Sequence, residues 1–258
     1  MTTVALPVPS LVISELLGVP FTDRDQYQHL TAELLSLDRT RDQLLASKAE
    51  MKSYLLHLIH TKRSAPADDL LSGLVQAQST DATLTDDEIA ALAQLILIAG
   101  HETTANVIGL AALMLLRPPR LWDTVRRQPE LVDGVIEETL RYATVLQFGL
   151  LRVAREPLTL AGQPVQAGER VVLHLPSANR DPDHFDPHRP DAAKHLSFGH
   201  GPHHCIGDQL ARIELRTVLT TMLRRFPDLR LVADPDEIPT HQHRVVHGPT
   251  HLPVDFTP

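Results

Sequence analysis

The segment Phe198-Gly199-His200-Gly201-Pro202-His203-His204-Cys205-Ile206-Gly207 contains the only cysteine in a chain of 258 residues. A lone cysteine cannot form an internal disulfide, so any function must come from its thiol or from metal binding. The glycines of this segment let the backbone approach a flat ligand closely. A helix is predicted from Ile206 onward, and a helix N-terminus favours a thiolate. A buried thiolate held in a glycine-rich loop is well suited to be the axial ligand of a haem iron.

Two other interpretations of Cys205 stay open at this point. It can be a buried structural cysteine without chemistry. It can also belong to a zinc site with His200, His203 and His204, because zinc binds cysteine and histidine. Structural zinc sites usually draw pairs of ligands from two separated segments, whereas these four residues lie side by side in the sequence. The spacing therefore favours haem over zinc.

Composition argues against several classes of protein. The net charge of −8 argues against a nucleic-acid binder, which usually carries a basic face. No uninterrupted run of apolar residues reaches the length of a membrane span, so we expect no membrane association. The N-terminus lacks the basic start and apolar core of a signal peptide. A single cysteine also fits a reducing compartment, and we therefore expect a cytoplasmic protein.

The length is compatible with one large domain or two small ones, and apolar periodicity predicts a chain that is mainly α with small β-sheets (α+β). Its parts are a helical region over 7–144, a β-rich region with the cysteine loop over 145–205, and a C-terminal helix and β-hairpin over 206–258. Helices are expected over 7–17, 23–37, 39–63, 69–78, 85–116, 119–127, 130–144 and 206–226. Strands are expected over 151–154, 158–160, 164–166, 170–175, 229–232 and 245–256, and an irregular stretch over 176–197.

The helix predicted over 85–116 is about 45 Å long at 1.5 Å per residue and apolar on nearly all sides, so we expect it to be buried and central. It contains Ala99-Gly100-His101-Glu102-Thr103-Thr104. Glycine inside a helix costs about 1 kcal/mol relative to alanine, and a threonine hydroxyl can bond back to the carbonyl four residues earlier. Together they can open a groove in the helix. The alternative is a packing glycine and a kink without chemistry.

Glu138 and Arg141 lie three residues apart on a predicted helix, so their side chains share one face. Such pairs are common on protein surfaces. This pair gains meaning from its order in the chain, since it follows the threonine helix and precedes the cysteine loop.

In this order the three motifs resemble those of the cytochrome P450 family, in particular its soluble actinobacterial members. The family's loop pattern is Phe-Gly-x-Gly-x-His/Arg-x-Cys-x-Gly, and every fixed position is matched by residues 198–207. The helix motif resembles the family's Ala/Gly-Gly-x-Asp/Glu-Thr-Thr, and Glu138-Thr139-Leu140-Arg141 resembles its Glu-x-x-Arg. The resemblance implies a single domain over 1–258 with the C-terminal two-thirds of the P450 fold, including a long central helix and a haem-binding loop.

The resemblance also implies roles for individual residues. Cys205 would ligate the iron of haem b, and Glu102 and Thr103 would deliver protons during oxygen activation. Arg152 and His203 would pair with the haem propionates. Other residues expected to contact the cofactor are Ala99, Gly100, Phe198, Gly199 and Gly207.

A structural brace is implied as well. In the family, the Glu-x-x-Arg pair locks onto an arginine of the irregular stretch and supports the haem loop. Glu138, Arg141 and Arg189 are the candidates for the three members. The segment between Arg189 and His195 is a few residues shorter than is usual in the family.

The implied activity is that of a monooxygenase inserting oxygen into a small organic molecule, in secondary metabolism. Ferredoxin and ferredoxin reductase would supply the electrons. Substrate contacts are expected from the central helix, the segment 145–150 and the tail, through Leu95, Ile98, Phe148 and Val246. These side chains are apolar, which favours an apolar or polycyclic substrate.

The resemblance begins near Ala5 and leaves roughly the first third of a family member without a counterpart, so we expect an N-terminally truncated chain. Three interpretations follow. The chain is a shortened enzyme, which could dimerise to cover an exposed apolar face; it is an inactive fragment; or it is a non-catalytic helper that binds a partner enzyme. Helpers of this kind generally lack the cysteine, so Cys205 counts against the third interpretation.

Overall fold

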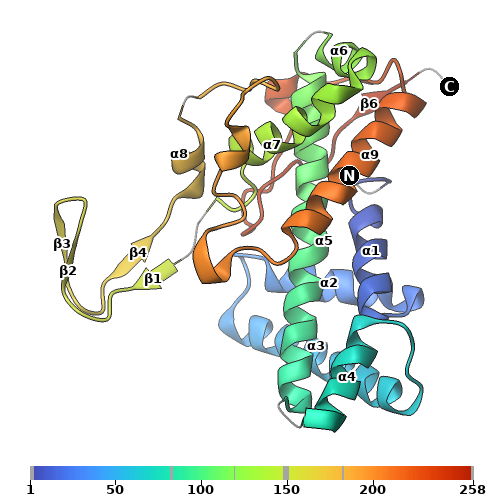
Figure 1. Cartoon of the computed structure of the whole chain (residues 1–258), viewed down its shortest axis with the longest axis vertical. Coiled ribbons are helices and arrows are strands. Elements are labelled where there is room, and N and C mark those ends of the chain that lie inside the picture. The colour runs from blue at the N-terminus through green and yellow to red at the C-terminus, as the bar shows by residue number, and fades with distance from the viewer. Residues whose placement is uncertain (1–2, 82–83, 119, 148–150, 182, 257–258) are drawn as a thin grey trace.

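A computed structural model describes residues 3–81, 84–118, 120–147, 151–181 and 183–256. The described residues are mainly helical, with three small antiparallel sheets, as the sequence predicts (Figure 1). The helices are α1 (Pro7–Leu17), α2 (Arg24–Leu34), α3 (Arg41–Ser64), α4 (Leu70–Asp81), α5 (Asp86–Leu116), α6 (Leu121–Arg127), α7 (Val132–Tyr142), α8 (Leu175–Asn179) and α9 (Asp208–Arg225).

The central helix α5 runs through the length of the molecule (Figure 1). Thr85 caps it, since its side chain accepts from the Glu88 amide while the Glu88 carboxylate accepts from the Thr85 amide. Its first half packs against α1, α3 and α4, and its second half packs against α6, α7 and α9. Two apolar cores therefore lie along one helix.

By length and composition α5 could cross a membrane, although no uninterrupted apolar run makes it obvious in the sequence. Within the structure 67% of the apolar window is buried against the rest of the chain. The second half of α5 is buried on nearly all sides, whereas the first half leaves apolar side chains such as Leu95 exposed. The predicted central position of this helix is confirmed, but its burial is less complete than its apolar character predicts.

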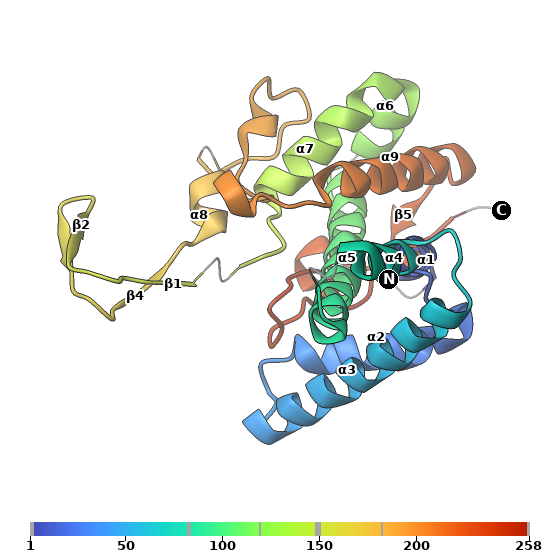
Figure 2. The ribbon, with the colours of Figure 1, turned by 60° about the horizontal axis from the view of Figure 1, so that its bottom comes forward.

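Strands β1 (Leu151–Val153) and β4 (Arg170–Val172) pair with each other, as do β2 (Leu158–Leu160) and β3 (Gln163–Val165). The turn between β2 and β3 consists of Ala161 and Gly162, both with positive φ, which matches the twist of a two-residue hairpin. The four strands form an arm that projects from the helices in both views, and none of their residues is buried (Figures 1 and 2).

The tail folds back across the helices. Residues 241–248, called the C-terminal strap below, connect two distant places. At one end Leu37 donates from its amide to the His243 carbonyl, and Val245 donates to the Leu35 carbonyl. At the other end the His247 amide donates to the Val145 carbonyl at 2.7 Å. Two short strands, β5 (Arg230–Leu231) and β6 (Val254–Asp255), pair beside it.

Several predicted boundaries are wrong. The helix expected from Ile206 begins at Asp208, since Gly207 is its N-cap and Ile206 is 96% exposed, so Cys205 precedes the helix rather than beginning it. The stretch expected to be irregular opens with α8, where Pro176 lies in the first turn and the His174 side chain accepts from the Ser177 amide. The two tail strands have only two residues each, and the strap, which overlaps the strand predicted over 245–256, pairs only through isolated bridges.

Candidate functional site

Cys205 lies at the end of a closed loop. Its amide donates to the Phe198 carbonyl at 2.8 Å, and the His204 amide donates to the Gly201 carbonyl at 2.9 Å. Gly199 and Gly201 both have φ of +74°, a left-handed conformation that side chains other than glycine rarely adopt. The glycines of the motif are thus required by the turn that presents the thiol.

The alternatives to a haem ligand find no support in this geometry. The Cys205 thiol is exposed, which contradicts its interpretation as a buried structural cysteine and also corrects the expectation that the thiolate is buried. Over the described ranges, no group of three or more histidine, cysteine, aspartate or glutamate side chains is placed to hold a metal ion. The histidines beside Cys205 in the sequence therefore do not form a zinc site with it in this structure.

A cavity of about 220 Å³ lies between the loop, α5 and α9, and the Cys205 thiol opens into it. The predicted residues that line this cavity are Ala99, Thr103, Phe198, Gly199, His203 and Cys205. Apolar side chains of α7, α8 and α9, such as Leu140, Leu175 and Leu215, complete the walls. A thiol facing a largely apolar cavity, with a threonine on the opposite helix, is the set of residues expected around a haem held by a cysteine thiolate.

The Thr103 hydroxyl bonds back to the carbonyl four residues earlier, as predicted for this part of the helix. Its Oγ1 donates to the Ala99 carbonyl at 2.6 Å, and both residues line the cavity. Gly100 is not placed as expected, because it faces α1 rather than the cavity. A Cβ added to Gly100 would lie 2.6 Å from Cδ1 of Ile13, so α1 packs closely on this glycine, and Gly100 does not line the cavity.

Glu102 is buried but points away from the cavity. One of its carboxylate oxygens lies 3.7 Å from Nη1 of Arg244 on the C-terminal strap. Asn106, one turn later on α5, donates from Nδ2 to the Glu102 carbonyl at 2.8 Å. The predicted proton donors Glu102 and Thr103 are thus neighbours in the sequence whose side chains lie on different sides of α5.

The brace residues do meet. The Glu138 carboxylate is fully buried and accepts two hydrogen bonds of 2.7 Å from Arg141 and one of 3.3 Å from Nε of Arg189. It also accepts from the Asp186 amide at 2.8 Å. Burial would raise the pKa of Glu138, but these donors, Arg141 foremost, hold it below its usual value. The cluster ties α7 to the segment that leads into the cysteine loop.

Arg152 is not brought to the cavity. It lies on β1 of the exposed arm, and its guanidinium donates to the neighbouring Leu151 carbonyl at 3.2 Å. The four strands pair only with one another and none of their residues is buried, and Arg152 does not line the Cys205 cavity, so among the described residues no contact holds it there as the expected propionate partner. At Gly207 a Cβ would lie 3.9 Å from the Cys205 sulfur, an ordinary contact, so packing does not demand glycine there.

The expected substrate residues do not assemble into one site. Leu95 is 64% exposed on the first half of α5, and neither it nor Ile98 lines the Cys205 cavity. Val246 is buried in the core, where the strap bridges to Leu146. Phe148 lies outside the described residues. Sequence reasoning missed the apolar walls from α7 and α9, although the helical spacing of apolar residues in these segments could have indicated them.

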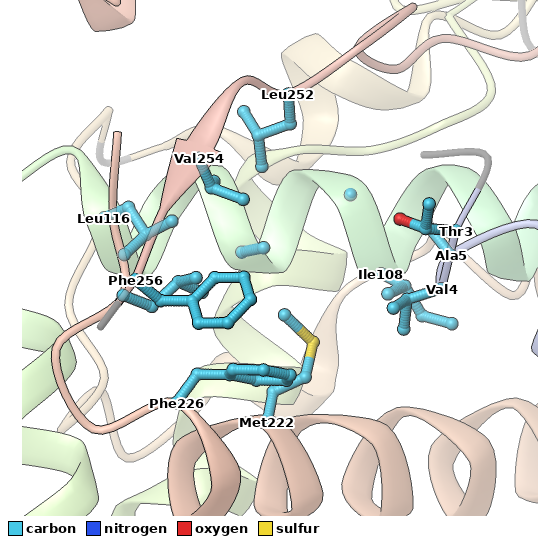
Figure 3. Close-up of a pocket in the computed structure, with 13 residues that line it drawn as sticks. Thr3, Val4, Ala5, Ile108, Leu116, Met222, Phe226, Leu252, Val254 and Phe256 are labelled. Carbon is cyan, nitrogen blue, oxygen red and sulfur yellow. The ribbon is translucent and has the colours of Figure 1, made fainter. Parts of the chain in front are cut away.

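A second cavity, of about 350 Å³, lies further along α5 (Figure 3). Ile108 and Leu116 of α5 face Met222 and Phe226 of α9 across it, and Phe256 closes one side. Its lining is apolar apart from Thr3 and includes no titratable side chain. The larger cavity therefore lacks the groups for chemistry, and the smaller one at Cys205 is the candidate site.

Comparison with known proteins gives a consistent result. A family model described as Cytochrome P450 matches residues 20–252. Cytochrome P450 105C1 of a Streptomyces species is 46% identical over 97% of this chain, and pentalenic acid synthase of Streptomyces avermitilis is 41% identical over 98%. The alignments cover 66% and 63% of those proteins, so the chain spans about two thirds of the length of its curated relatives.

Solved structures agree with the sequence relatives. The crystal structure of CYP105P1 in complex with filipin I superposes with a TM-score of 0.94 at 38% identity. That alignment covers 99% of this chain and 66% of the solved chain. The described helices and sheets are therefore arranged as in that structure over nearly the whole chain.

Proposed function

Because this chain belongs to the cytochrome P450 family, we propose that it binds haem b through the Cys205 thiolate and acts in a monooxygenase reaction on a small, apolar organic molecule. Family members hold haem through a cysteine thiolate. The observation that supports the proposal most strongly is the shared cavity of Cys205, His203 and Thr103.

Bound haem would supply the iron centre at which oxygen is activated, and the residues of this chain would prepare its surroundings. Cys205 would donate thiolate charge from the loop side. Thr103 would present Oγ1 from the helix side. In this structure its hydroxyl proton is donated to the Ala99 carbonyl, so the hydroxyl would have to rotate to donate into the cavity. His203, at the rim, can donate to a carboxylate of the cofactor, whereas Arg152 would need the arm to move.

Glu102 would take up a proton from solvent at its carboxylate and pass it to Oγ1 of Thr103. Since its carboxylate faces Arg244, this role requires a rotation of the Glu102 side chain or an intervening water. The apolar walls from α7, α8 and α9 would keep bulk water out of the cavity.

Substrate and partners belong to the same proposal. Relatives bear names such as pentalenic acid synthase and cytochrome P450 monooxygenase PikC, which supports a small-molecule substrate in secondary metabolism. Ferredoxin and ferredoxin reductase in the cytoplasm would supply electrons. A homodimer would cover the apolar side chains exposed on α5.

The single cysteine allows a direct test. Without haem, a thiol-specific disulfide reagent should label one thiol per chain, because Cys205 is exposed. Saturating haem should protect that thiol, and the reduced protein should show the long-wavelength Soret band of a thiolate–carbon monoxide complex.

The control is Cys205→Ser, which should lose this band while keeping the fold. Unprotected thiol in the haem-saturated wild type, together with a Soret band that is the same in the serine variant, would contradict the proposal.

A further inference from the structure

Two adjacent carboxylates on α7 face different parts of the structure. Glu138 belongs to the brace with Arg141 and Arg189. Glu137, the residue before it, faces α9 and the cysteine loop. Nothing in the motifs of the sequence assigns a role to Glu137 or to its partner on α9, Arg212.

The guanidinium of Arg212 is held in a fixed plane. Its Nε donates to Glu137 at 2.6 Å and its Nη2 donates to the same carboxylate at 3.1 Å, so the ion pair is bidentate. Its Nη1 donates to the Asp208 carboxylate at 2.9 Å. Hydrogen bonds from all three nitrogens restrict both the position and the tilt of the group.

The plane of Arg212 lies against the Phe198 ring. The central guanidinium carbon is 4.6 Å from the ring centroid, within the range of a cation–π contact. Two imidazoles flank the same ring, that of His195 at 5.6 Å and that of His204 at 6.4 Å between centroids. The Phe198 ring is therefore contacted by a cation and by two further rings.

Phe198 is also directly connected to the thiol. Its carbonyl accepts from the Cys205 amide at 2.8 Å, and its side chain lines the same cavity as the sulfur. A shift of Phe198 would therefore move the backbone that carries Cys205. The contacts run in order from Glu137 through Arg212 and Phe198 to Cys205.

The charges of the pair persist at neutral pH. Burial would raise the pKa of Glu137, but the adjacent His195 and Arg212 lower it to about 2. The same carboxylate raises the pKa of Arg212 above its ordinary value. Both shifts favour the charged forms, so the pair is an ion pair at neutral pH.

We propose that Arg212, fixed by Glu137, is a positioning residue that sets the Phe198 ring and thereby the placement of the Cys205 sulfur towards the cofactor. The inference rests on the proposed haem-binding role of Cys205. Lysine cannot replace this arginine, because an ammonium group lacks the planar, bidentate geometry.

The chain offers a matched control. Arg216, one turn further on α9, pairs with Asp133 of α7 at 2.7 Å, so it joins the same two helices. Both of its partners are largely exposed, at 62% and 58%, and the pair has no part in the contacts described above. Arg216→Gln therefore removes a similar ion pair without touching the loop.

The first experiment needs no haem. Hydrogen exchange of the Cys205 amide, followed by mass spectrometry of the 198–207 segment, should accelerate about tenfold in Arg212→Gln and Arg212→Lys, but not in Arg216→Gln. Exchange in α1 and α3 should stay unchanged, which separates a loosened loop from a globally destabilised protein. Equal exchange rates in Arg212→Gln and wild type would overturn the inference, whether or not the protein binds haem.

The second experiment uses the haem-loaded protein. The midpoint potential and the Soret band of the carbon monoxide complex should shift in both Arg212 variants and stay at the wild-type values in Arg216→Gln. Wild-type values in Arg212→Lys would overturn the planar positioning role, because lysine keeps the charge. Failure of the wild type to bind haem would instead contradict the proposed function, while the exchange measurement would still decide the contacts of Arg212.

Discussion

At the residue scale, a buried carboxyl group without a matching cation stands out on α9. Glu214 is 6% exposed, and its Oε2 has no hydrogen-bond partner among the described residues. Burial raises the pKa of Glu214 to about 7. Such a group stays protonated in the folded chain at a pH where the unfolded chain has already ionised.

The sign of the pH dependence follows. Below the usual glutamate pKa both states hold the proton, and between that value and about 7 the unfolded state loses it first, so stability falls as pH rises. Glu214→Gln should abolish this fall and raise the free energy of unfolding at pH 8 by roughly 1–3 kcal/mol, with little change at pH 4. Urea unfolding at the two pH values measures the effect. The exposed Glu130→Gln serves as control, and parallel pH profiles of wild type and Glu214→Gln would contradict the assignment.

Chemical motifs were predictable at this scale, and burial was not. Cys205 and Thr103 could be identified because their neighbours in the sequence form recognisable patterns. Glu137, Arg212 and Glu214 could not, since acidic and basic residues at helical spacing are typical of any solvated helix face. Only the packing of the folded chain shows which of these side chains are buried.

At the element scale, two helical glycines lie in opposite surroundings. A Cβ on Gly134 of α7 would lie 2.1 Å from the backbone carbonyl oxygen of Pro187, so α7 and that segment approach closely only without a side chain. A Cβ on Gly73 of α4 would have no neighbour within 4 Å. The same substitution should therefore have opposite effects at the two positions.

Gly73→Ala should stabilise the chain by about 0.5–1 kcal/mol, because alanine is the better helix former. Gly134→Ala should destabilise it by more than that, since a backbone atom cannot move aside as a side chain can. Thermal unfolding of the two variants beside wild type measures both effects. A stabilising Gly134→Ala would show that α7 does not pack on the Pro187 segment as described.

Element positions were predicted better than element ends. The capping box at Thr85 and the left-handed Gly18 after α1 are local signals, and the predicted helices begin or end there. The helix α8 was missed because an irregular, proline-rich stretch hides one short turn. The start of α9 moved by two residues, since the cysteine loop takes up Ile206 and Gly207.

At the scale of the whole molecule, cofactor binding should be coupled to stability. The candidate cavity is lined from α5, α7, α8, α9 and the loop, so a ligand there would contact most of the C-terminal half of the chain. A ligand that binds only the folded state stabilises it by about 2.7 kcal/mol at a hundredfold excess over its Kd. Haem should therefore raise the Tm in a concentration-dependent way.

Differential scanning fluorimetry or circular dichroism across a haem titration measures this shift. Cys205→Ser should show a smaller rise at each haem concentration, because it lacks the axial thiolate. A Tm that does not respond to haem in either protein would contradict binding in the folded state.

The order of the helices, the central position of α5 and the loop that presents Cys205 could all be predicted from the sequence, because periodicity, caps and glycine-rich turns are local properties. Which motif residues meet depends instead on how distant segments pack. Within one helix the tertiary structure turned Thr103 to the cavity, Gly100 to α1 and Glu102 to the strap, and it left Arg152 on the arm. Each step along a helix rotates the side chain by about 100°, so adjacent motif residues face different neighbours, and packing between distant segments selects those neighbours.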